Sequence, residues 1–236
     1  MNVQFAGFLF DRLIAPEFFT LARISLPDVP ELPNYYGSYF LQNIFRSENE
    51  DRSRPLVFAF LRHLNQGIRE YRSGRLALLE FGSTEQHSNN AIAHYLHALT
   101  HFEQAVFHCD IAASASHAIA RCIVASTPEK HFTPGGRAPE DRLRHLYNAV
   151  KHFDETVAEG ALVDYVSPIW LVSEGVRGIK NDRKSGLPVI ETLKFEEMAV
   201  IFLELASNAA FLAEEVFRIA HERQAVKIAG NKESLR

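Results

Sequence analysis

Residues 89–126, NNAIAHYLHALTHFEQAVFHCDIAASASHAIARCIVAS, decide the fold. This stretch is expected to form one very long helix, capped at Asn89 or a neighbour and stopped by Thr127–Pro128, because a residue before proline avoids helical backbone. Apolar side chains lie on several of its sides, and small residues follow one another in its second half. Because such a helix packs among other elements, we expect it to be the central helix. The apolar side chains are Ile92, Leu96, Leu99, Phe102, Val106 and Ile111, and the small ones are Ala112, Ala113, Ser114, Ala115 and Ser116.

Three further segments show apolar residues at helical spacing. The first begins at Pro55 and is punctuated by Gly74 and by residues 81–83. The second is expected over residues 139–158, which open with a proline that suits the first turn of a helix. The third is expected from about residue 195 to residue 225. The stripes that define the first and third segments are Val57, Leu61, Leu64, Ile68 and Tyr71, and then Met198, Ile201, Phe202, Leu205, Ala209, Leu212 and Val216.

Residues 163–179 and 187–195 are two extended runs around the turn-rich NDRKSG, which predicts a β-hairpin before the last helix. The sequence therefore predicts a mostly α protein, a helical bundle of four or more helices with a small β-hairpin before the last long helix. The bundle is expected to occupy residues 51–228, with the hairpin insert at about 163–194. Residues 1–50, which prolines interrupt, are expected to pack on the bundle as short irregular elements with a strand near the start. The polar residues 229–236 are expected to form a frayed tail.

The composition limits the classes of function. The chain has 236 residues, of which 47% are hydrophobic and 23% charged, so a packed core is expected. A net charge of −4 argues against a generally basic surface, so nucleic acid would bind only at a local patch. No uncharged run approaches the ~18–20 residues that span a bilayer, and the start lacks the basic region of a signal peptide. We therefore expect a cytoplasmic protein without membrane contact, whose two cysteines, Cys109 and Cys122, stay unbridged in the core.

The segment RLRHLYNAVKHFDE, residues 142–155, has two opposite faces on a helical wheel. One face is an apolar seam, and the other is purely polar. The polar face is either an ordinary solvated surface or the lining of a cleft or subunit interface. In the second interpretation two histidines share protons, an acid orients a ring and an asparagine donates a hydrogen bond to an oxyanion. The seam consists of Leu143, Leu146, Val150, Phe153 and Val157, and the polar face consists of Asp141, His145, Asn148, His152 and Glu155.

Within this segment, LYNAVKHFDE resembles the signature region of HEPN-type (higher eukaryotes and prokaryotes nucleotide-binding) helical bundles. Their pattern is an arginine, usually followed by a polar residue such as asparagine, then three or four residues and a histidine. Asn148 and His152 match the asparagine and the histidine, whereas Tyr147 stands at the arginine position. Many members of that superfamily are metal-independent ribonucleases of toxin–antitoxin, abortive-infection and CRISPR systems. They typically dimerise so that two copies of the motif meet in a cleft.

The resemblance implies two related functions. One is a catalytically degenerate binding or regulatory module of a bacterial defence or toxin–antitoxin system, because a phenol cannot supply the permanent positive charge of an arginine. The other is an active ribonuclease in which His152 is the acid/base or phosphate ligand, Asn148 positions the substrate and Arg144 supplies the charge. Both imply a homodimer, RNA or a nucleotide as ligand, a protein partner in a regulatory role, and no cofactor. The binding candidates beside these three are Tyr147, Lys151, His145 and Glu155.

A histidine stripe along the long central helix supports a third hypothesis. Histidines three or four residues apart on one helix can chelate a metal, and His94, His97 and His101 are the candidate ligands. The stripe carries no carboxylate at a matching position, so a metal would need ligands from another helix. The third hypothesis is therefore an unrelated helical interaction protein or a metal-binding bundle. The stripe consists of His87, Asn90, His94, His97, His101, Gln104 and His108.

Overall fold

The structure, a computed structural model, describes residues 26–43, 53–84, 89–123, 138–158, 167–181 and 188–213. These residues are mostly helical, with one small antiparallel sheet before the last helix, as the sequence predicts. The last helix covers residues 195–213 of the described range. The other elements are α3 (Tyr35–Asn43), α4 (Ser53–Ser83), α5 (Asn89–Ile123), α6 (Pro139–Lys151), α7 (Phe153–Ala158), β1 (Ile169–Val172), β2 (Gly175–Asn181) and β3 (Pro188–Lys194).

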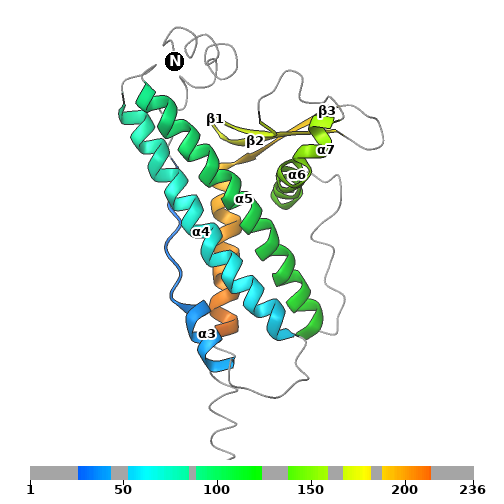
Figure 1. The fold of residues 1–236 in the computed structure, drawn as a ribbon. Coiled ribbons are helices and arrows are strands. Elements are labelled where there is room, and N and C mark those ends of the chain that lie inside the picture. The colour runs from blue at the N-terminus through cyan, green and yellow to red at the C-terminus, as the bar shows by residue number, and fades with distance from the viewer. Residues whose placement is uncertain are drawn as a thin grey trace, which may run out of the picture.

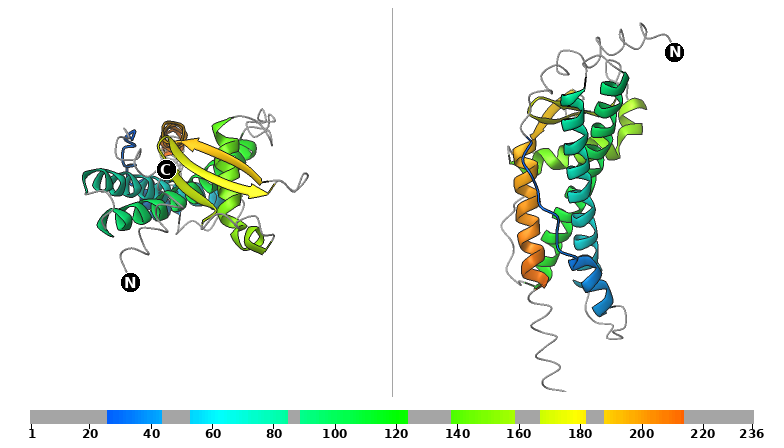
Figure 2. Two further views of the ribbon diagram at one scale, coloured as in Figure 1. Left: turned by 90° about the horizontal axis from the view of Figure 1, so that it is seen from above. Right: turned by 90° about the vertical axis from the view of Figure 1, so that its left-hand side faces the viewer.

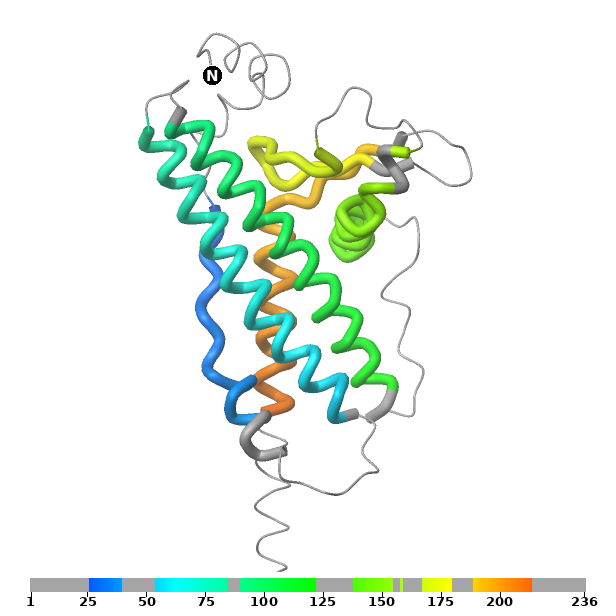
Figure 3. The backbone as a smooth tube through the Cα atoms, in the orientation of Figure 1, coloured from blue at the N-terminus to red at the C-terminus, as the bar shows by residue number. Residues whose placement is uncertain are grey.

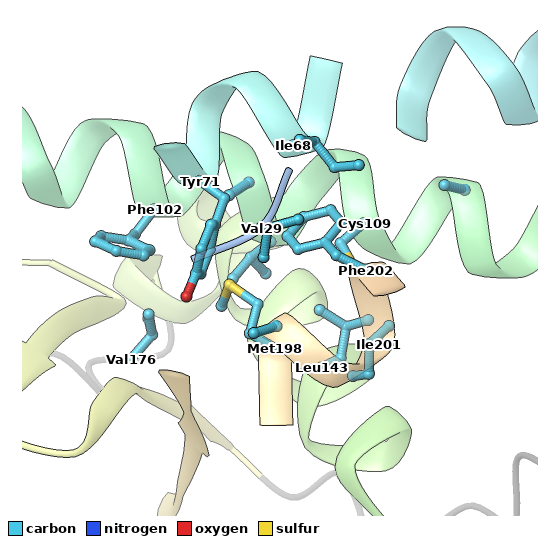
Figure 4. Close-up of a cluster of buried hydrophobic side chains, with 14 of the residues drawn as sticks. Val29, Ile68, Tyr71, Phe102, Cys109, Leu143, Val176, Met198, Ile201 and Phe202 are labelled. Atoms are coloured by element: carbon cyan, nitrogen blue, oxygen red, sulfur yellow. The ribbon is translucent and has the colours of Figure 1, made fainter. Parts of the chain in front are cut away.

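The main body consists of α4, α5 and the last helix, which lie side by side (Figures 1 and 2). The stripe predicted for α4 is buried throughout, and so are Phe102 and Val106 of α5. Rings from all three helices meet in the core, where Tyr71 makes edge contacts with Phe102 and Phe202 at centroid distances of 5.7 Å (Figure 4). The helix α5 also contacts α6 and β1, so the prediction of a central helix is confirmed.

Gly74 does not interrupt α4, which continues through it to Ser83. A glycine inside a helix costs about 1 kcal/mol relative to alanine, so its presence needs a packing reason. A Cβ at this position would lie 3.0 Å from the ring of Phe102. The missing side chain therefore lets α5 approach α4 closely, and the expected break in the helix is wrong.

The segment before α3 lies along α4. The hydroxyl of Tyr71 donates a hydrogen bond to the carbonyl of Pro27 at 2.9 Å, and Nε of Arg75 donates to the carbonyl of Leu26 at 3.1 Å. Leu26 and Val29 are buried against the core. Residues 26–43 thus pack on the bundle and include the helix α3, whereas the strand expected near the start of the chain lies outside the described residues.

The sheet has three strands in the order β1-β2-β3, all antiparallel. The first predicted extended run is itself a hairpin, because Val172 pairs with Gly175 across the two residues Ser173 and Glu174. The small β element before the last helix is present as predicted, and it has one more strand than a two-stranded hairpin. Gly175 allows this arrangement, since a Cβ there would lie 2.1 Å from the carbonyl oxygen of Leu193 on β3.

The helix α6 lies beneath the sheet and across α5 (Figures 1 and 3). Leu143, Leu146 and Ala149 form its buried face. A Cβ at Gly178 of β2 would lie 2.4 Å from Cδ2 of Leu146, so the glycine makes room for α6 on the sheet. One continuous helix over residues 139–158 is wrong, because the chain leaves helical geometry at His152. Of the expected seam residues beyond His152, Phe153 is 39% exposed, and the side chain of Val157 lies outside the described residues.

The last helix begins at Phe195, as predicted, and is fastened at its start by Glu197. The backbone N–H of Lys194 donates to Oε2 of Glu197 at 3.0 Å, and the guanidinium of Arg142 on α6 forms an ion pair with the same carboxylate. The end predicted near residue 225 lies outside the described residues, as does the tail. None of the helices in the described ranges is long and apolar enough to cross a membrane.

Candidate functional site

The polar face of α6 is half-buried along the described part of its length. Asp141, His145, Asn148 and His152 are all of intermediate exposure, and the side chain of Glu155 lies outside the described residues. His152 closes the helix with φ −108° and ψ 31°, and its backbone N–H donates to the carbonyl of Asn148 at 3.0 Å. The two residues that match the HEPN pattern therefore stand at the junction of α6 and α7.

Arg144, which is not part of the polar face, reaches α5. Its Nε lies 2.9 Å from Oδ1 of Asp110, and its Nη2 donates to the hydroxyl of Ser114 at 2.6 Å. The Asp110 side chain is 2% exposed, whereas the Arg144 side chain is 42% exposed. The ion pair thus has a buried end and an open end, and it fixes the guanidinium at the edge between α5 and α6.

Burial raises the pKa of Asp110 to about 6, although the positive charges of Arg144 and Lys151 pull it in the opposite direction. A carboxylate is more costly to bury when it is ionised, and nearby cations return only part of that cost. Asp110 is therefore ionised above pH 6 and compensates Arg144 there. Below pH 6 it becomes neutral, and the positive charge at this edge increases.

Tyr147 lies between the two cations of α6. The Cζ atom of Arg144 and the Nζ atom of Lys151 are each 5.7 Å from the centre of its ring. Phe107 of α5 lies on the same ring with a centroid distance of 5.7 Å. Lys151 is exposed, and Tyr147 is partly buried against the core. Cations at this distance from a ring face are attracted by its quadrupole, so the aromatic ring and the two positive charges form one unit.

We call this unit the α5–α6 polar cluster. It presents the exposed ammonium group of Lys151, the guanidinium of Arg144, which Asp110 and Ser114 hold in place, and the aromatic ring of Tyr147 beside both cations. Such a set can bind an anion, and the ring edge can contact a planar group attached to that anion. It consists of Phe107, Asp110, Ser114, Arg144, Tyr147 and Lys151.

The histidine stripe of α5 lies against α4, and α4 supplies the carboxylates that the stripe itself lacks. His94 pairs with Glu80 at 3.1 Å and His101 with Glu70 at 2.6 Å, in both cases through Nδ1. His101 also contacts His97. The carboxylates that the sequence could not assign to this stripe therefore come from α4. Among the described residues no group of three or more His, Cys, Asp or Glu side chains could hold a metal ion, and His87 lies outside them.

Further along the same seam, His108 meets His63 of α4, with their Nδ1 atoms 2.8 Å apart. Burial lowers the pKa of both imidazoles, and the positive charge of Arg62 lowers both further. Because a hydrogen bond between two ring nitrogens needs one donor and one acceptor, this contact requires at least one neutral ring. The seam therefore contains one histidine pair that favours neutrality and two histidine–glutamate pairs.

Of the predicted site residues, Arg144, Tyr147 and Lys151 come together, and Arg144 also pairs with Asp110. Sequence reasoning missed Asp110, although a single acid between Cys109 and Ile111 in an apolar and small-residue stretch is a usable signal. The pairing of Asp110 with Arg144 could not be inferred, because the spacing of residues within each helix does not show where α5 and α6 cross. Cys109 is a free, buried cysteine, as expected.

The fold and the cluster define a class of protein, a helical bundle capped by a three-stranded sheet, with α6 fastened to α5 through a buried acid. No protein-family model, curated protein or solved structure matches the chain. The kinship with HEPN-type bundles accordingly stays a prediction from the motif at Asn148 and His152.

Proposed function

We propose that this protein is a cytoplasmic HEPN-like module that binds single-stranded RNA or a nucleotide at the α5–α6 polar cluster and does not cleave it. The observation that carries the proposal is the placement of Tyr147 between Arg144 and Lys151, with Arg144 fixed by Asp110. In this role the protein would act as a binding or regulatory component of a bacterial defence or toxin–antitoxin system.

The cluster has the chemistry that single-stranded nucleic acids require. Lys151 is exposed and offers a point charge to a phosphate, and the Arg144 side chain, which is 42% exposed, adds a second positive charge beside the same ring. Bases stack on aromatic rings and on guanidinium planes in a way that tolerates sequence. With a net charge of −4, binding depends on this local patch.

Two features favour binding over cleavage. Tyr147 occupies the arginine position of the motif, and the nearest guanidinium, that of Arg144, is compensated by a carboxylate above pH 6. The transition state of phosphodiester cleavage carries more negative charge than the ground state. A guanidinium that is already compensated by a carboxylate stabilises that additional charge less than a free guanidinium would. The alternative, an active metal-independent ribonuclease using His152 and Asn148, is tested by the same preparation.

The test is fluorescence anisotropy with a labelled single-stranded RNA at low salt and pH 7.5. Lys151→Ala is expected to weaken binding at least fivefold, and Asp110→Asn is expected to tighten it, because the site then loses one negative charge. Lys194→Ala is the matched control, since it removes an exposed lysine from β3. Equal weakening by Lys151→Ala and Lys194→Ala, or no RNA binding by the unmodified protein, would contradict the proposal.

Cleavage is measured on the same RNA with a chelator present. The proposal expects intact RNA. Metal-free cutting that His152→Ala abolishes would favour the ribonuclease instead. Because HEPN-like bundles typically pair, we also expect a concentration-dependent homodimer by light scattering, and a strict monomer would contradict that part.

A further inference from the structure

The imidazoles of His97 and His101 meet one helical turn apart on α5. Their Nε2 atoms are 2.8 Å apart, and the ring centroids are 4.4 Å apart. Because each ring nitrogen carries either a proton or a lone pair, this contact needs one shared proton. We propose that His97 and His101 form a binding site for a late first-row transition-metal dication, Cu²⁺ foremost, in which the metal takes the place of that proton and the proton moves through solvent to Nδ1 of His97.

Glu70 of α4 prepares His101 for this role. Its Oε2 atom lies 2.6 Å from Nδ1 of His101, and its Oε1 atom accepts a hydrogen bond from Gln66 at 2.6 Å. A carboxylate at Nδ1 holds the proton there and leaves the lone pair on Nε2. Metal-bound histidines commonly donate their second N–H to a carboxylate, which fixes the ring and raises its basicity. His101 already has that orientation.

The separation of the two nitrogens points to particular metals. Metal–imidazole bonds are about 2.0–2.1 Å long, and two such bonds to atoms 2.8 Å apart enclose an angle of about 90°. That angle belongs to neighbouring positions of a square-planar or octahedral ion, as in Cu²⁺ and Ni²⁺. A tetrahedral Zn²⁺ needs nitrogens about 3.3 Å apart at those bond lengths. Intrinsic affinity also places Cu²⁺ first among these ions.

The other histidines of the seam are less suited. The pair His63–His108 has the same nitrogen separation, but Arg62 is close enough to lower the pKa of both rings, and the same positive charge repels a dication. His94 pairs with Glu80, and among the described residues it meets no second imidazole. Among the described residues, the pair His97–His101 therefore combines two nitrogens, an orienting carboxylate and access from solvent.

The site is a two-nitrogen chelate, and its remaining positions are filled by water or by groups of a bound molecule. His97 is exposed, and the side chains of His101 and Glu70 keep 22% and 18% of their surface accessible, so the metal can enter without unfolding. His97 and Asp110 are separated by about 20 Å of helix rise. The metal site is thus independent of the proposed RNA-binding cluster.

The experiment is a Cu²⁺ titration of the full chain at pH 7.5 in a non-coordinating buffer, followed by electron paramagnetic resonance. The unmodified protein is expected to bind one ion more than the double variant His97→Ala/His101→Ala, with nitrogen hyperfine structure for that ion. His94→Ala is the matched control and should keep the ion, because it removes another histidine paired with a glutamate of α4. Glu70→Gln is expected to weaken binding about 10- to 100-fold.

Equal copper uptake by the unmodified protein and the double variant would overturn the proposal, and so would an equal loss in His94→Ala. Unchanged affinity in Glu70→Gln would overturn the role assigned to Glu70. Far-UV circular dichroism of each variant shows whether the fold is retained. None of the replaced histidines is fully buried, so all the variants are expected to keep their helix content.

Discussion

Asp110 couples the stability of the protein to the charge of its polar cluster. It is buried on α5 and ion-paired with Arg144, yet burial raises its pKa to about 6. A carboxyl group whose pKa is higher in the folded state binds its proton more tightly there than in the unfolded chain. Its stabilising contribution is complete below the unfolded pKa of about 4. It is lost as the pH rises through 6.

The variant Asp110→Asn should remove this dependence. As the pH falls from 7 to 4, the unmodified protein should gain up to about 3 kcal/mol of unfolding free energy relative to the variant, since two pKa units correspond to roughly that amount. At pH 7.5 the variant should be at least as stable, because asparagine keeps a polar group beside Arg144 without the cost of burying a carboxylate charge. Urea unfolding across this pH range measures both quantities. Parallel stability curves for the two proteins would contradict the assignment.

The burial of a single residue could be predicted from the sequence where it depends on helical spacing. It could not be predicted where it depends on contacts between different elements. Leu143 and Leu146 were placed in the seam correctly by their period. The direction of Arg144 could not be predicted, because it depends on where Asp110 of another helix lies. Gly178 illustrates the same limit, since only the approach of Leu146 to β2 explains its lack of a side chain.

At the scale of elements, the apolar stripes were enough to predict the long helices. They were not enough to predict where a helix is continuous and where it ends. Packing on Phe102 outweighs the helix-breaking tendency of Gly74, so α4 continues through it. His152 ends α6 without any proline or glycine as a signal. The turn at Ser173 and Glu174 lacks the Asn-Gly or Asp-Gly pair that marks a two-residue hairpin, so the additional strand was missed.

The seam between α4 and α5 provides an element-scale prediction. The pKa of His63 and of His108 is lowered by burial, and both pKa values are also lowered by Arg62, while Glu70 raises that of His108. A histidine with a lowered pKa in the folded state contributes stability above its unfolded pKa of about 6.5, and this contribution is lost as the pH falls through the folded value. Acid should therefore loosen this part of the helix pair.

The double variant His63→Leu/His108→Leu should unfold with a weaker pH dependence below 6.5 and with nearly unchanged stability at pH 7.5. Replacing both partners by apolar groups removes the hydrogen bond without leaving a buried donor or acceptor unpaired. Thermal unfolding at several pH values measures the difference from the unmodified protein, and this difference is separate from the opposite effect of Asp110. A variant as sensitive to acid as the unmodified protein would show that the pair does not titrate in this range.

At the scale of the whole molecule, the three-helix body and the layer of α6 and the sheet are joined at Glu197. This carboxylate accepts the N–H of Lys194 at the start of the last helix and pairs with Arg142 of α6. One side chain thus closes the first turn of a helix, as in a capping box, and fastens α6 to the body. The buried faces of α6 on α5 and β2 add the apolar part of the joint.

Glu197→Ala should consequently loosen the joint more than the body. Losing a charged, partly buried hydrogen-bond acceptor costs about 1–3 kcal/mol, and the helix start loses its cap as well. Amide hydrogen exchange is expected to accelerate in α6 and in residues 195–199, while the centres of α4 and α5, around Leu64 and Phe102, keep their protection. Those centres are fully buried, and they exchange only when the helix pair itself opens. Equal acceleration of amide exchange in all helices would mean that the molecule opens as one cooperative unit. The joint at Glu197 would then not control the opening of α6 separately from the body.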